Sequence, residues 1–73
     1  MEWYNVRTKV PERGKKVMII SEEGKILSNY LYDSEYYTDE ELKSEIWESF
    51  IVKNYDYWCY INDLIDYARI KAN

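Results

Sequence analysis

Residues 15–32 constrain the fold more than any other stretch, because they are typical of a β-hairpin. Val17, Ile19 and their neighbours form a short apolar, β-branched arm that suits a strand buried on both faces. Gly24 can take the positive φ that closes a tight turn after Glu22 and Glu23. The second arm alternates, which predicts one face with Ile26, Ser28, Tyr30 and Tyr32 and another with Leu27, Asn29 and Leu31.

The remaining elements follow from local signals. Residues 3–7 predict a first strand, and the loop that follows contains Pro11 and Gly14. Thr38 and Glu41 have the spacing of a capping box, so we expect a helix over about residues 39–49. Leu42 and Ile46 begin its apolar row, which Phe50 would continue, although residues 50–52 also suit a strand.

Residues 55–61 are the most aromatic part of the chain and predict a strand that pairs with Tyr30 and Tyr32. Tyr55, Tyr57, Cys59 and Ile61 would share one face, opposite Asp56, Trp58 and Tyr60. Asn62 or Asp63 can cap a last helix.

These elements predict one small α+β domain over residues 1–73. It has a three- to four-stranded antiparallel sheet, one helix inserted before the last strand and a short C-terminal helix. Both helices would cover one face of the sheet. The expected sheet core is Trp3, Val6, Val17, Ile19, Ile26, Leu27, Leu31 and Trp58, and the helices would contribute Leu42, Ile46, Phe50, Leu64 and Ile65.

Composition argues against an enzyme and against a bound metal or cofactor. The chain has no His and a single Cys, so an internal disulfide and an ordinary zinc site are excluded. Cys59 lies in an aromatic strand without a His to activate it, and we expect an inert thiol. Asp63 and Asp66 are better explained by helix capping than by acid–base chemistry. Gly14 and Gly24 lie too far apart for a phosphate-binding loop.

The sequence also predicts a cytoplasmic protein without a membrane segment. No stretch approaches the roughly 20 apolar residues that span a bilayer. The first residues lack the basic and apolar regions of a secretory signal, and one unpaired cysteine suits a reducing compartment.

Charge is distributed unevenly along the chain. Residues 1–32 contain six basic and four acidic residues, whereas residues 33–73 contain four basic and ten acidic residues. The acidic half, with two tyrosines in a polar loop, suggests a surface that binds a basic partner, although a solvated helix face explains the same pattern. Glu41, Glu45 and Glu48 would form one row on an α-helix. The candidate partner-binding residues are Tyr36, Tyr37, Glu40, Glu41, Glu45 and Glu48.

A basic set near the N-terminus supports an alternative, a nucleic-acid-binding accessory protein. Such residues can contact phosphates, with Trp3 or Tyr4 for stacking, but lysines also protect the edges of sheets. The overall charge of −4 opposes nucleic acid. The residues of this set are Arg7, Lys9, Arg13, Lys15 and Lys16.

The frame Trp3-x-x-Val6, then Pro11-x-x-Gly14-x-x-Val17, then a late strand with Trp58, resembles a family of short phage and prophage proteins whose domain has no assigned function. The chain departs from that pattern at Tyr57, where the family has His, and at Tyr60 and Asn62, where it has Pro. The resemblance implies a small β-rich fold of phage-type origin and supplies no catalytic residue to transfer.

Together these features predict a non-enzymatic interaction module of phage or mobile-element type. It would bind a host or phage protein with a basic surface, as a monomer or a homodimer. Inhibition of a nucleic-acid-handling system, in an anti-defence role, fits the acidic surface.

Overall fold

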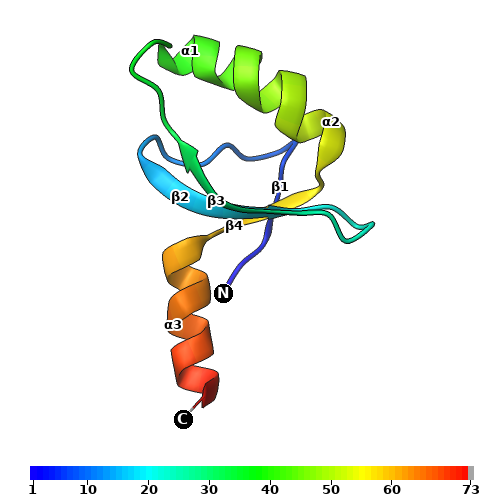
Figure 1. Cartoon of the computed structure of the whole chain (residues 1–73), viewed down its shortest axis with the longest axis vertical. Coiled ribbons are helices and arrows are strands. Elements are labelled where there is room, and N and C mark those ends of the chain that lie inside the picture. Colours follow the sequence, from blue (N-terminus) through cyan, green and yellow to red (C-terminus); the bar gives the residue numbers. More distant parts are fainter. Residues whose placement is uncertain (73) are drawn as a thin grey trace.

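The computed structural model describes residues 1–72 and confirms a small α+β architecture. Four strands form one antiparallel sheet in the order β1-β4-β2-β3. A continuous helical segment lies above this sheet in Figure 1, and a second helix extends below it. In chain order the elements are β1 (Tyr4–Asn5), β2 (Lys15–Ile20), β3 (Ile26–Tyr32), α1 (Asp39–Glu41), η1 (Leu42–Ile51), α2 (Val52–Asn54), β4 (Tyr57–Tyr60) and α3 (Ile61–Ala72).

The predicted hairpin is present as β2 and β3, but its second arm does not alternate uniformly. The register shifts between the pairs Val17↔Tyr30 and Ile19↔Leu27, which is a β-bulge. Asn29 has a φ of 58° at this point. The extra residue puts Leu27, Tyr30 and Tyr32 opposite Ile19, Val17 and Lys15, and it leaves Ile26 and Leu31 opposite Ile20 and Lys16. Ile26 and Leu27 have therefore exchanged faces relative to the prediction, whereas the residues after the bulge lie on the predicted faces.

The aromatic strand β4 lies between β1 and β2. Its register places Trp58 opposite both Tyr4 and Ile19, and Cys59 opposite Met18. The prediction that this strand pairs with Tyr30 and Tyr32 is wrong, because β2 separates β4 from β3. Strand β1 is shorter than predicted, since the chain turns after Asn5, whose carbonyl accepts hydrogen bonds from the next turn.

The first helical segment is longer than predicted. It begins with the expected capping box at Thr38 and continues to Asn54, so residues 50–52 are helical. Across η1 the hydrogen bonds run from residue i to residue i+5, as in a π-helix. Residues four and five apart, Leu42, Trp47 and Ile51, therefore share the buried face. Phe50, predicted to continue that face, is instead 49% exposed.

Two buried tryptophans join the helix to the sheet. The rings of Trp47 and Trp58 lie 6.3 Å apart at 89°, an edge-to-face contact. The indole N–H of Trp47 donates to the carbonyl of Val6 at 2.8 Å, and that of Trp58 donates to the carbonyl of Lys9 at 2.8 Å. These bonds hold the segment between β1 and β2 against the core. The predicted core members Trp3, Ile26, Leu31 and Ile65 are exposed, because they lie outside the space between sheet and first helix.

Helix α3 does not cover the face that was predicted for it. It begins at Ile61, directly after β4 and before the expected caps Asn62 and Asp63. It extends from the side of the sheet opposite the first helix (Figure 1), and none of its residues is buried. Neither α3 nor any other helix within residues 1–72 has the length and apolar character needed to cross a bilayer.

Candidate interaction surface

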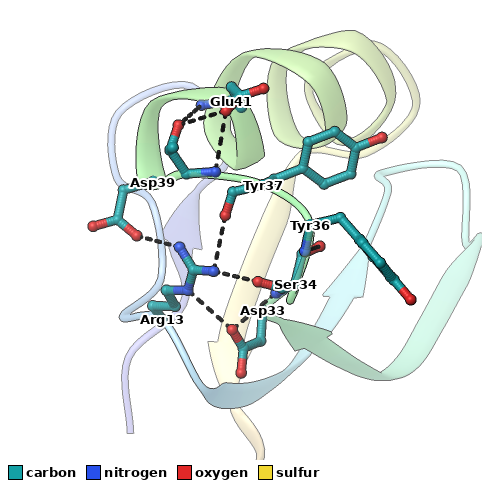
Figure 2. Close-up of polar contacts among 8 residues, drawn as sticks. Arg13, Asp33, Ser34, Tyr36, Tyr37, Asp39 and Glu41 are labelled. Carbon is teal, nitrogen blue, oxygen red and sulfur yellow. Dashed lines mark hydrogen bonds and ion pairs between the residues drawn. The ribbon is translucent and has the colours of Figure 1, made fainter.

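The loop of residues 33–38, between β3 and α1, is held by one arginine from a distant part of the chain. Arg13 precedes β2, where the N–H of Gly14 donates to the Tyr32 carbonyl at 2.8 Å and brings the arginine beside the end of β3. Its guanidinium donates to Asp33 Oδ1 at 3.0 Å, to Asp39 Oδ1 at 2.6 Å and to the Tyr37 carbonyl at 2.9 Å. A further bond reaches the carbonyl of Ser34 (Figure 2).

These contacts use the planar fork of arginine in a way that lysine could not reproduce. The hydrogen bond to Asp39, and to a smaller extent that to Asp33, raises the pKa of Arg13 above its ordinary value. Asp33 Oδ1 also accepts from the N–H of Ser34 at 2.8 Å, and Ser34 Oγ accepts from the N–H of Tyr36 at 3.1 Å. The loop backbone is therefore fixed at both ends and in the middle.

Two tyrosines lie on this fixed loop. Tyr36 is 88% exposed, the highest value among the large hydrophobic side chains of residues 1–72, and its ring points away from Arg13 (Figure 2). Tyr37 is 37% exposed. The helix start follows at once, where Glu41 Oε1 accepts from the N–H of Thr38 at 3.3 Å and from its hydroxyl at 3.0 Å. The loop thus presents an apolar ring beside an acidic helix N-terminus.

The predicted carboxylates lie close to these tyrosines in sequence but do not form one row. The α-helical spacing behind that prediction does not apply across η1. Glu41 is engaged in the capping box, and Glu48 borders a groove with Lys43 and Trp47. Glu40, Glu45 and Glu48 are exposed and form no ion pair within residues 1–72. They contribute negative charge to the exposed part of the helical segment.

The predicted basic set is largely engaged with the protein itself. Arg7 pairs with Asp56 at 3.7 Å and donates to the carbonyl of Val52 at 3.1 Å. The Nζ of Lys9 lies 4.0 Å above the ring of Tyr4. Lys15 pairs with Glu12 at 3.8 Å, and Arg13 holds the loop described above. Lys16 is exposed and makes no ion pair in the part of the chain that the structure describes.

Arg13, a member of the predicted basic set, makes contacts that the sequence did not predict. It bonds to Asp33 and Asp39, 20 and 26 residues further along the chain. No local pattern predicts this contact, because it depends on how the hairpin brings residue 13 beside the end of β3. Through the Tyr37 carbonyl, one member of the predicted basic set thus contacts one member of the predicted partner-binding set.

The one cysteine of the chain, Cys59, is buried in strand β4. Burial raises the pKa of the Cys59 thiol, and the Asp63 carboxylate adds to the shift, so the thiolate is disfavoured. Within residues 1–72, no three Cys, Asp or Glu side chains come together as a potential metal site. What the surface offers is an exposed aromatic ring, a fixed loop and excess negative charge.

Comparison of the chain with protein-family models, with curated proteins and with solved structures gives no significant match. The resemblance to a phage family stays a prediction. In the structure, Val6, Val17 and Trp58 of its frame are buried and Trp3 is 38% exposed.

Proposed function

We propose that this chain is a non-enzymatic module that binds another protein through one acidic, tyrosine-bearing surface. This surface, the acidic tyrosine surface, consists of Tyr36, Tyr37, Glu40, Glu41, Glu45 and Glu48. The observation that carries the proposal is Tyr36, a large ring that is 88% exposed on a loop held by Arg13. A soluble domain gains nothing for its own stability from such a ring, whereas burial of tyrosine at an interface contributes strongly to binding.

The fixed loop supports binding in a second way. Association costs free energy when a flexible loop must be ordered, about 0.5–1.5 kcal/mol for each immobilised side chain. Here the backbone around Tyr36 is already held by Ser34, and the neighbouring Tyr37 carbonyl accepts from Arg13. The backbone of this loop would therefore need little further ordering on binding.

The charge of the surface indicates the chemistry of the partner. Glu40, Glu45 and Glu48 are exposed and form no ion pair within residues 1–72, so their carboxylates are available to a basic protein surface. A protein that handles nucleic acid carries such a surface, and occupying it would inhibit that protein. The predicted phage-type, anti-defence role belongs to this proposal and draws on the family resemblance and this charge.

The test is an affinity pull-down of the tagged full chain from nuclease-treated bacterial lysate, at low and high salt. We expect a discrete protein that binds the wild type, binds less at high salt and is lost with Tyr36→Ala. Phe50→Ala is the control for loss of an exposed aromatic ring, because Phe50 is 49% exposed on the helical segment that follows the loop and lies outside the proposed surface. Charge reversal with Glu45→Lys and Glu48→Lys should also abolish binding.

Two results would contradict the proposal. One is a bound set of proteins that does not change with Tyr36→Ala, or no retained protein at all. The other is a bound set that disappears with nuclease and with Lys16→Ala, which would favour the nucleic-acid alternative instead.

A further inference from the structure

Helix α3 packs only weakly against the rest of the fold. It spans Ile61–Ala72, none of its residues is buried, and it projects from the sheet (Figure 1). The radius of gyration is 12.7 Å, whereas a compact chain of this length would have about 11 Å. Isolated helices of about 12 residues are marginal in water, and most helical stability in proteins comes from packing an apolar face. The outer turns of α3 therefore lack the packing that such a helix needs.

A shallow groove with both apolar and acidic lining residues runs between α3 and the N-terminal residues. Its apolar lining is Met1, Tyr4, Tyr67 and Ile70, and its charged lining is Glu2, Asp63 and Asp66, with no basic residue among them. These three carboxylates form no ion pair within residues 1–72. The groove therefore suits an apolar side chain flanked by cations.

Helix α3 itself carries such a side chain. Ile70 is 74% exposed, and its neighbours in the chain are Arg69 and Lys71. Arg69 forms no ion pair in the described part of the chain, and Lys71 contacts only the face of the Tyr67 ring, at 5.7 Å. The cations and the groove that would accept them are thus on the same molecule.

Helix geometry allows two copies to satisfy each other in this way. Asp63, Asp66, Tyr67 and Ile70 are spaced three and four apart and lie on one face of α3. Asp63 and Ile70 are about 10 Å apart along the axis, at 1.5 Å per residue. An antiparallel pair of helices centred between Asp66 and Tyr67 places Ile70 of each copy beside Asp63 of the other.

We propose that two copies of this chain associate through antiparallel α3 helices. Ile70 of each copy enters the groove of the other, and Arg69 and Lys71 approach the carboxylates of Glu2, Asp63 and Asp66 there. The arrangement also sets the two helix dipoles in opposite directions. A 12-residue helix pair is smaller than a standard protein interface, so the dimer is concentration-dependent. This surface is separate from the acidic tyrosine surface, and the two proposals fail independently.

The test is sedimentation velocity of the full chain over a wide concentration range. The wild type should shift from monomer to dimer, and Ile70→Asp should weaken the association by about tenfold or more, since it places a carboxylate against Asp63. Ile26→Asp is the matched control, because Ile26 is a 64% exposed isoleucine at the start of strand β3 and does not line the groove. Circular dichroism of each variant confirms that the fold is kept.

A charge exchange gives the sharper test. Asp63→Lys alone should weaken the dimer, because lysine would meet Arg69 and Lys71 of the other copy. Adding Lys71→Asp should restore the dimer, because opposite charges then face each other again. Both changes oppose the dipole of α3, so stabilisation of the helix within one copy cannot explain a recovery. A wild type that stays monomeric, an Ile70→Asp dimer as strong as wild type, or a double variant without recovery would overturn the proposal.

Discussion

Arg13 and Asp39 lie 26 residues apart in the chain, and the Nη1 of Arg13 donates to Asp39 Oδ1 at 2.6 Å. This pair joins the loop before β2 to the first residue of α1. Because the same guanidinium also donates to Asp33 and to the carbonyls of Ser34 and Tyr37, one side chain determines how the tyrosine loop is presented.

Arg13→Ala should release that loop without unfolding the domain. The ion pairs are exposed, and such pairs contribute little to global stability. We expect faster amide hydrogen exchange at Tyr36 and Tyr37, with the unfolding midpoint almost unchanged. Arg13→Lys should resemble the alanine variant, because a single ammonium cannot reach four acceptors. Lys16→Ala is the control, and equal protection of the loop in all variants would refute this role.

Trp47→Phe should destabilise the domain strongly. Trp47 is 1% exposed, and its indole N–H satisfies the carbonyl of Val6 at 2.8 Å. The substitution leaves both a cavity and an unpaired buried acceptor, so we expect a loss of about 2–4 kcal/mol in the free energy of unfolding. Urea titration measures it. Trp3→Phe, at a 38% exposed position, should change the value by less than about 0.5 kcal/mol.

Asn29→Ala should destabilise the hairpin, whereas Asn29→Gly should not. Asn29 has a φ of 58° at the bulge, a region that asparagine and glycine tolerate and alanine does not. The expected cost of alanine is about 1–2 kcal/mol in thermal or urea unfolding. If alanine and glycine behave alike, backbone conformation at residue 29 is not what sets the bulge.

Stability should fall at alkaline pH. Burial raises the pKa of Tyr30, Tyr32 and Cys59, so the folded state favours their neutral forms more than the unfolded state does. Their contribution is fully present below the unfolded-state pKa values and is lost as the pH rises through the folded-state values. The guanidinium chloride concentration at the unfolding midpoint should stay constant near neutral pH. It should decrease above pH 9.0, the ordinary pKa of a cysteine thiol. Cys59→Ala should remove the first part of that decline, and stability that rises with pH would contradict the assignment.

By itself, the sequence determined the features that depend on neighbours in the chain. The hairpin of residues 15–32, the turn at Gly24 and the capping box of Thr38 and Glu41 were all predictable. Each rests on turn conformation, strand propensity or hydrogen bonds within a few residues. The sequence also placed Tyr36 and Tyr37 in a polar loop, and both are exposed in the structure.

Only the tertiary structure decided the features that depend on distant contacts. These are the place of β4 between β1 and β2, the bulge at Asn29, and the burial of Trp47 and Trp58 while Trp3 stays exposed. The first helix extends through residues 50–52 because Ile51 packs in the core. The β-branched residues Ile51 and Val52 favour a strand by local propensity, so the sequence does not predict this extension. The partners of Arg13 and the position of α3 were likewise hidden. Local propensity carries no information about which residues meet across the fold, and burial of apolar area against distant elements decides those contacts.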